Sequence, residues 1–281
     1  MEVGVNMTIS SRSIDLARLA EKAESLGFES LWLPEHPVMP VHTTSQYRGT
    51  ADGSIPEYMS DMADPYIGLA AASGVTRQLK LGTSISLIPE RNPLLLAKEI
   101  STLDYFSGGR FILGVGAGWL KEETEIMGGD FEHRWTQTRE AILVMKELWT
   151  KEEAEFHGRY FDFPPVKCYP KPVQKPHPPV LLGGTARNVF KRVVGWADGW
   201  MPSGPTAEQV KAGRAALDEL ADAAGRDPQS IQITAFAVPT DADALKEIAE
   251  AGADRAIVRL PDTSNEGALA ELERMAERVL P

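Results

Sequence analysis

Short apolar runs alternate with longer amphipathic segments along almost the whole chain. Runs of this kind, bounded by glycine or proline, predict eight buried strands, at residues 2–7, 28–34, 79–85, 111–115, 180–184, 199–201, 231–238 and 255–259. Apolar residues repeat with a period near 3.6 in the segments between them, which predicts helices at 12–26, 64–72, 92–106, 186–196, 207–224, 241–250 and 266–279, with two more inside 120–150.

Several helix ends carry their own local signals. Ser11 is the expected cap of the first helix and Gly27 its expected stop, because a serine hydroxyl caps free N–H groups and glycine adopts the left-handed conformation. Asp64-Pro65 and Asn92-Pro93 each pair a capping side chain with a first-turn proline, so each predicts a helix start.

Regular alternation of strands and helices predicts an α/β fold. A similar unit, a glycine helix stop followed by a short apolar strand and a proline, recurs at residues 27–34, 195–202 and 252–261. Its presence at both ends of the chain favours a closed (β/α)8 TIM barrel with insertions over an open sheet. We therefore expect one domain over residues 1–281, with two loop excursions at about 35–61 and 152–179, the second including a hairpin at 155–163.

Charge and cysteine content narrow the classes of function. The net charge of −11 argues against a nucleic-acid partner and against binding to anionic membranes, since both require a basic surface. Cys168 is the only cysteine, which excludes an intramolecular disulfide and a thiolate metal site, and no other metal-ligand spacing is visible. No signal peptide or membrane-length apolar run is recognisable, so we expect a cytoplasmic enzyme acting on a small molecule.

Glycines mark the end of the fourth predicted strand. Gly114, Gly116 and Gly118 follow the apolar run from Phe111 and precede a helix-like segment. Glycine lets another body approach the backbone closely, and in a TIM barrel ligands bind at the carboxyl ends of the strands. This stretch is therefore interpreted as part of a ligand site.

Glu35-His36 is the only acid–imidazole pair at a predicted strand end. A histidine at the barrel mouth could transfer a proton, because its unperturbed pKa lies near neutrality. It could equally orient the loop that begins at Pro37. The residues alone leave both interpretations open.

Gly183-Gly184-Thr185 has the composition of a phosphate cradle, with small residues, a hydroxyl and a following helix. A plain tight turn explains it as well. Trp32, Trp119 and Trp200 are expected to be core residues.

Several motifs resemble those of the luciferase-like monooxygenase superfamily. They are Trp32-Leu33-Pro34-Glu35-His36, Leu81-Gly82-Thr83-Ser84-Ile85, Gly109 to Trp119 with Glu122, Tyr160-Phe161, Pro170 to Gln174, Gly183-Gly184 and Ala197 to Trp200. Within the superfamily, the chain looks most like the coenzyme F420-dependent oxidoreductases of actinobacteria.

This resemblance implies a deazaflavin ring across the barrel mouth, with its tail running toward the fifth strand. It implies a cis peptide bond at Ser84–Ile85, Glu35 near the polar edge of the ring, and His36 facing the substrate. The cofactor-binding residues that it implies are Glu35, Thr83, Ser84, Ile85, Ala117, Gly118, Glu122, Gly183, Gly184 and Thr185, the last three at the phosphate. It also implies a homodimer formed through helices near strands two and three.

One position departs from the family pattern. The sugar-phosphate dehydrogenases of the family have a glutamate where this chain has Trp119, which argues against that reaction. The leading hypothesis is therefore an F420-dependent oxidoreductase that transfers a hydride to or from an unidentified small organic substrate. The alternatives are an FMN-dependent monooxygenase using reduced flavin and oxygen, and an F420-binding protein without turnover. An unrelated aldolase-type barrel is disfavoured because Lys80 and Lys98 are poorly placed for Schiff-base chemistry.

Overall fold

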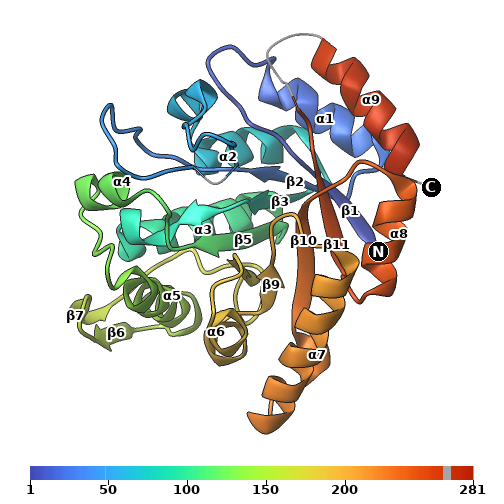
Figure 1. Cartoon of the computed structure of the whole chain (residues 1–281). Helices are drawn as coiled ribbons and strands as arrows, with labels where there is room; N and C mark the ends of the chain where they lie inside the picture. The colour runs from blue at the N-terminus through green and yellow to red at the C-terminus, as the bar shows by residue number, and fades with distance from the viewer. Residues whose placement is uncertain (48, 262–266, 281) are drawn as a thin grey trace.

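Parallel strands close into a barrel in the computed structural model, which describes residues 1–47, 49–261 and 267–280 (Figure 1). The barrel strands in this part of the chain are β1 (Glu2–Asn6), β2 (Ser30–Leu33), β3 (Lys80–Thr83), β5 (Phe111–Gly116), β8 (Val180–Gly183), β9 (Gly199–Met201), β10 (Gln232–Val238) and β11 (Arg255–Arg259). They pair in the order β3-β2-β1-β11-β10-β9-β8-β5, and β3 also pairs with β5, which closes the ring. The predicted (β/α)8 barrel is confirmed.

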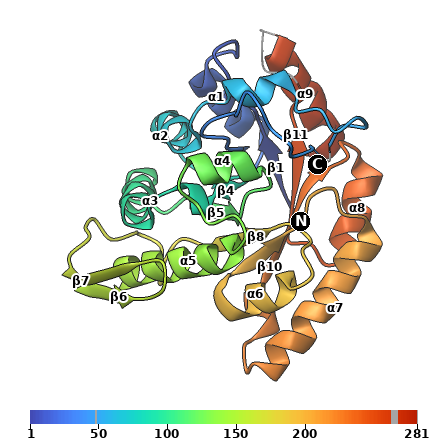
Figure 2. The same ribbon diagram turned by 60° about the vertical axis from the view of Figure 1, so that its left-hand side comes forward.

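Helices surround the barrel, and α1 and α9 lie side by side in both ribbon views (Figures 1 and 2). The described helices are α1 (Leu16–Leu26), α2 (Pro65–Val75), α3 (Pro93–Ser107), α4 (Lys121–Ile126), α5 (Arg134–Thr150), α6 (Val189–Trp196), α7 (Ala207–Ala223), α8 (Ala242–Glu250) and α9 (Gly267–Val279), with short 3-10 turns η1 (Glu57–Asp61), η2 (Ile88–Glu90) and η3 (Pro228–Ser230). None of these helices has the length and apolar character needed to cross a membrane.

The predicted helix signals are confirmed with one exception. Asp64 caps α2 and Asn92 caps α3 through their side chains, and Gly27 ends α1 with a φ of 96°. The prediction of Ser11 as the first cap was wrong, because Asp15 accepts the capping hydrogen bond from the Arg18 N–H. Ser11 instead bonds to Asp61, so it ties the start of the chain to η1.

The core has an outer and an inner part. The larger part fills the space between the strands and the helices, and the smaller one fills the barrel with Trp32, Ile112, Leu181, Met201 and Ile257. Trp32 is fully buried and Trp200 nearly so, as predicted for core residues. Burying a large apolar side chain contributes about 1.5–3 kcal/mol, so both parts stabilise the closed barrel.

The third predicted strand is interrupted after Thr83. The Ser84–Ile85 peptide bond is cis, as the resemblance implied, and the chain resumes as a short strand β4 (Ser86–Leu87) that pairs with β5.

Glycines of β5 and β8 leave room for this interruption. A Cβ at Gly116 would collide with the Ile85 side chain, and one at Gly114 would collide with the Thr83 carbonyl. A Cβ at Gly183 would lie 3.1 Å from Ile85 Cδ1. The Thr83 carbonyl therefore occupies the space beside Gly114, which corrects the interpretation of this glycine as a ligand contact. Gly116 has Ile85 beside it and also lines the barrel-mouth cavity described below.

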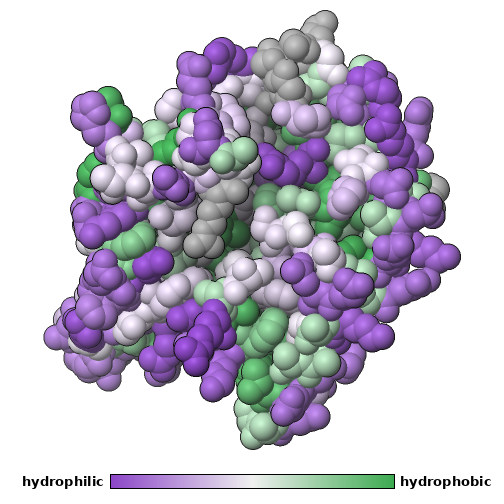
Figure 3. Space-filling model, in the orientation of Figure 1, coloured by the Kyte–Doolittle hydropathy of each residue, from purple (hydrophilic) through white to green (hydrophobic). Residues whose placement is uncertain are grey.

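Both excursions leave the barrel pattern. The segment after α5 forms an antiparallel hairpin of β6 (Ala154–His157) and β7 (Asp162–Val166), which lies outside the barrel next to α5 (Figure 2). The excursion at 35–61 contains the 3-10 turn η1. Its described residues form no α-helix and no β-strand. Polar side chains gather along the edges of the face seen in Figure 3, with apolar groups between them.

Candidate active site

A cavity of about 330 Å³ opens at the carboxyl ends of the barrel strands. It is lined by most of the predicted site residues, namely Glu35, His36, Ser84, Ile85, Ala117, Gly118, Gly183 and Gly184. These residues come from the segment that follows β2, the β3–β4 interruption, and the ends of β5 and β8. The fold therefore brings together positions that are up to about 150 residues apart in sequence, as expected at a TIM-barrel mouth.

Three predicted site residues do not line this cavity. The Thr83 hydroxyl donates to the Gly114 carbonyl at 2.7 Å and so joins β3 to β5. Glu122 accepts hydrogen bonds from the Thr44 N–H and the Ser45 hydroxyl, which lower the pKa of its carboxyl. These contacts attach α4 to the 35–61 excursion. Thr185 lines a separate cavity described below.

The cavity also contains aromatic residues that sequence reasoning did not assign to it. Trp119 lines its wall, so the expectation that this residue belongs to the core was wrong. The Trp119 ring contacts the rings of His36 and Tyr47, with centroid distances of 5.8 Å and 5.4 Å. Tyr58 and Phe236 line the cavity too. Two sequence signals pointed to Trp119: it directly follows a glycine at a strand end, and it occupies the position where the family's sugar-phosphate dehydrogenases have a glutamate.

Asn6 and Arg259 add polar groups from β1 and β11. The Asn6 side-chain amide donates to the Ser84 hydroxyl at 2.8 Å and to the Trp32 carbonyl at 3.1 Å. Asn6 thus fixes the position of Ser84 at the floor of the cavity. Arg259 is the lining residue with a positive charge.

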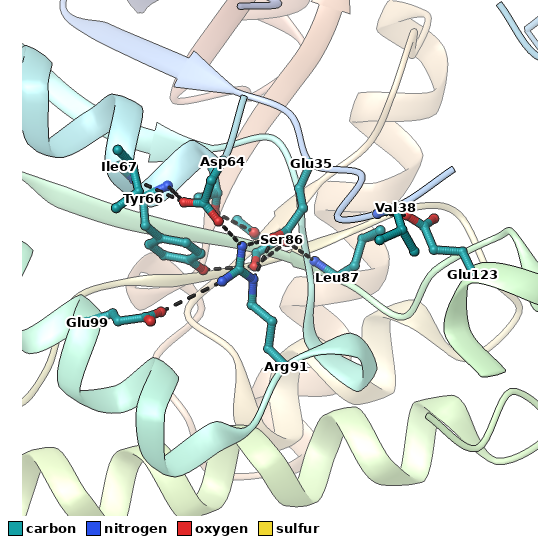
Figure 4. A network of polar contacts seen from close by, with 12 residues as sticks. Glu35, Val38, Asp64, Tyr66, Ile67, Ser86, Leu87, Arg91, Glu99 and Glu123 are labelled. Carbon is teal, nitrogen blue, oxygen red and sulfur yellow. Dashed lines mark hydrogen bonds and ion pairs between the residues drawn. The ribbon is translucent and has the colours of Figure 1, made fainter. Parts of the chain in front are cut away.

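Glu35 is part of a buried ion-pair network (Figure 4). One carboxylate oxygen accepts hydrogen bonds from the Ser86 hydroxyl at 2.8 Å and the Leu87 N–H at 2.7 Å. The other pairs with the Arg91 guanidinium, which also binds Asp64 at 2.6 Å. Glu35 is only 4% exposed, so these bonds satisfy a charge that would otherwise be costly to bury. The network ties the chain after β2 to β4, η2 and the start of α2.

His36 is held by a different element, helix α4. Its Nδ1 lies 2.7 Å from Glu123 Oε2, and both side chains are buried. The Val38 N–H donates to the other oxygen of Glu123 at 3.4 Å. Both the imidazole and the backbone that follows it are therefore fixed by one carboxylate of α4.

The Gly183-Gly184-Thr185 segment bends at the end of β8, and its backbone is tied to β9. The Gly184 N–H donates to the Met201 carbonyl at 3.2 Å, and its carbonyl accepts from the Trp200 indole at 2.8 Å. Gly184 has a φ of 94°, which favours glycine. Helix α6 begins only at Val189, three residues later than predicted.

A second cavity of about 300 Å³ lies beyond this turn. Thr185, Arg187, Phe190 and Gln209 line it, and Ser203 lines both cavities. Ser203 therefore borders both the barrel mouth and this side cavity. Among the residues that the structure describes, no group of three or more histidine, cysteine or acidic side chains could hold a metal ion.

Comparison with known proteins finds sequence relatives and a structural neighbour, and the names of these proteins include two kinds of cofactor. Over 285 residues and 99% of both chains, the protein is 39% identical to an uncharacterised protein of Mycobacterium tuberculosis. It is 30% identical over 243 residues to the FMNH2-dependent dimethylsulfone monooxygenase of Pseudomonas putida, covering 83% of this chain and 61% of the relative. An F420-dependent secondary alcohol dehydrogenase, whose structure was solved with an F420-acetone adduct, has a TM-score of 0.77 and 19% identity, with coverage of 99% of this chain and 98% of that chain.

The model of the luciferase-like monooxygenase family matches residues 3–279. This match spans nearly the whole chain, and the cis Ser84–Ile85 bond and the barrel agree with what the motifs implied. The chain belongs to the luciferase-like monooxygenase family.

Proposed function

We propose that this protein is an F420-dependent oxidoreductase that transfers a hydride between the deazaflavin and a small organic substrate. The observation that carries the proposal is the position of His36, a buried imidazole that lines the barrel-mouth cavity and is held by Glu123. Oxidation of an alcohol, or reduction of a carbonyl group, moves a proton together with the hydride. A fixed histidine beside the cavity suits that step.

The cavity fits a ring system of this kind. Its volume of about 330 Å³ lies in the usual range for small-molecule pockets, roughly 300–1,000 Å³. Ile85, Ala117 and Phe236 offer apolar surface, while Ser84 and Arg259 offer polar groups for a ring edge. The side cavity beyond Ser203 would take the cofactor's anionic tail, with Thr185 and Arg187 beside it.

When bound, F420 supplies the hydride chemistry, and the residues of this chain supply position and proton transfer. Ser84, Ile85, Ala117 and Gly118 would hold the ring, and Gly183 and Gly184 would shape the passage to the side cavity. His36 would exchange a proton with the substrate oxygen. Glu35 and Glu122 would support the loop that covers the substrate, through their bonds to Arg91 and Thr44.

A second candidate is an FMN-dependent monooxygenase. It is favoured by the 30% identity to the dimethylsulfone monooxygenase of Pseudomonas putida. Such an enzyme would use the same cavity, with reduced flavin and oxygen as reactants. A third possibility is a protein that binds F420 without turnover. Unlike either enzyme, it would not need the fixed imidazole of His36.

Ser203→Trp is expected to weaken F420 binding at least about tenfold, which corresponds to about 1.4 kcal/mol. Ser203 is exposed and lines both cavities, so an indole there would obstruct the passage that the cofactor tail requires without disturbing the core. Fluorescence titration with F420 measures the change. Ser25→Trp on the outer face of α1 is the matched control and should bind as the unmodified protein does. Equal affinity of all three proteins would place the tail elsewhere.

We also infer a homodimer formed through α2 and α3. These neighbouring helices expose the large apolar side chains Ile67, Leu95 and Phe106, which are 74%, 60% and 71% exposed. Apolar groups of this kind mark protein interfaces. Light scattering of the purified chain should give twice the mass of 30.7 kDa, and the mass of a single chain would contradict the inference.

A further inference from the structure

Two buried carboxyl groups lie behind His36, and the sequence pattern assigned a role to neither. Glu123 comes from α4 and is fully buried, and Glu90 comes from η2 and is 3% exposed. The two elements are in contact. Buried acidic side chains are rare unless they are paired, so each needs a physical explanation.

Glu123 restricts the imidazole of His36 to one tautomer. An ionised carboxylate accepts hydrogen bonds and cannot donate one, so the 2.7 Å contact with Oε2 requires a proton on Nδ1. In a neutral imidazole the other nitrogen, Nε2, then carries a lone pair. The edge-on contact with the Trp119 ring, at an interplanar angle of 85°, restrains the ring from a second side.

Glu90 is the neutral member of the pair. Its Oε1 accepts from the Thr124 hydroxyl at 2.8 Å, and its Oε2 has no hydrogen-bond partner among the described residues. Burial and the charge of Glu123 raise the pKa of Glu90 to about 8, the charge of Glu35 adds to this, and Thr124 and Arg91 act in the opposite direction. Near neutral pH the Glu90 carboxyl is therefore mostly protonated.

We propose that Glu123 is the positioning residue of His36: its carboxylate fixes the Nδ1–H tautomer and presents Nε2 for proton exchange at the barrel mouth. The catalytic consequence rests on the proposed function. The tautomer itself does not, because the contacts that fix it are all within the chain.

Nitrogen NMR of the 15N-histidine-labelled protein tests the tautomer without any cofactor. His36→Ala identifies the His36 signals among those of the five histidines. The unmodified protein should show a proton on Nδ1 of His36. Glu123→Ala should lose this state and give the tautomer mixture of a solvated histidine. Glu123→Gln should also weaken it, because a single amide oxygen cannot accept from both the Val38 N–H and the His36 Nδ1–H. Glu125→Ala, an exposed carboxylate on the same helix, is the control and should change nothing.

An Nε2–H tautomer in the unmodified protein, or an unchanged tautomer in Glu123→Ala, would overturn the proposal. If Glu123→Ala does not fold, Glu123→Gln provides a second readout. Less of the Nδ1–H tautomer is expected in Glu123→Gln than in the unmodified protein, seen in the same spectra. An unchanged His36 tautomer in Glu123→Gln would also contradict the proposal. Neither result depends on whether the protein binds F420. A failure of the tautomer proposal can therefore be told apart from a failure of the proposed function.

Glu90→Gln tests the uncharged state of the neighbour. A carboxyl whose pKa is higher in the folded than in the unfolded chain lowers stability progressively as the pH rises from its ordinary value of 4.5 to about 8. Glutamine mimics the protonated acid at every pH, so the variant should gain stability relative to the unmodified protein over this range and the gain should level off above it. Denaturation curves at several pH values measure this difference. Parallel pH profiles for the two proteins would show that Glu90 is already ionised and would contradict its raised pKa.

Discussion

His36→Ala should lower turnover by roughly 100- to 10,000-fold, the range typical of losing a general acid or base. The imidazole lines the barrel-mouth cavity and its Nδ1 is held by Glu123, so Nε2 is the nitrogen that can serve a ligand. Cofactor affinity should change far less, because the expected ring contacts come from other strand ends. Steady-state kinetics combined with a cofactor titration measures both quantities.

His42→Ala is the matched control for this experiment. His42 lies in the same excursion of the chain but is exposed and does not line the cavity. It should keep the turnover of the unmodified protein. Unchanged turnover in His36→Ala would reduce His36 to a support of the loop, the other interpretation that the sequence allowed.

Arg255→Met should destabilise the fold by about 3 kcal/mol, the low end of what breaking a buried ion pair costs. The Arg255 guanidinium is almost fully buried at the start of β11 and donates to both carboxylate oxygens of Glu29 at 2.8 Å and to Glu2 at 2.7 Å. Methionine retains much of the volume but leaves Glu29 with Lys80 as its remaining cationic partner. Chemical denaturation near neutral pH measures the loss.

The pH dependence of this effect follows from Glu29. Burial opposes ionisation of its carboxyl, but the hydrogen bonds and charge of Arg255 outweigh it and lower the pKa to about 2. A lowered pKa contributes stability that is present above the ordinary value of 4.5 and is lost as the pH falls toward 2. The difference between Arg255→Met and the unmodified protein should shrink over that range. Arg274→Met, which breaks an exposed pair with Glu271, should cost at most about 1 kcal/mol, and an equal loss in both variants would contradict the assignment.

The sequence was sufficient to predict the barrel because its signals are local. Each strand is a short apolar run between turn residues, and caps such as Asp64 and Asn92 act within three residues of themselves. The prediction of Ser11 as the cap of α1 failed because two capping residues, Ser11 and Asp15, precede this helix. Only the packing of the chain against Asp61 decides between them.

The candidate site was predicted only in outline because its contacts are long-range. Glu35 meets Arg91, which lies 56 residues further along the chain, and His36 meets Glu123 at a separation of 87 residues. No local pattern indicates such pairs. The spaced glycines of β5 show the same limit: their sequence indicates a close approach, but the approaching groups at Gly114 and Gly116 are Thr83 and Ile85.

The proposed cofactor is tested most directly by an equilibrium titration of the purified protein with F420 and, separately, with FMN, followed by fluorescence. The proposal predicts saturable F420 binding, at least about tenfold tighter than FMN, a difference of about 1.4 kcal/mol or more. It also predicts that Ser203→Trp weakens the F420 curve. Tight binding of FMN alone would contradict F420 dependence and favour the monooxygenase, and binding of neither cofactor would contradict both.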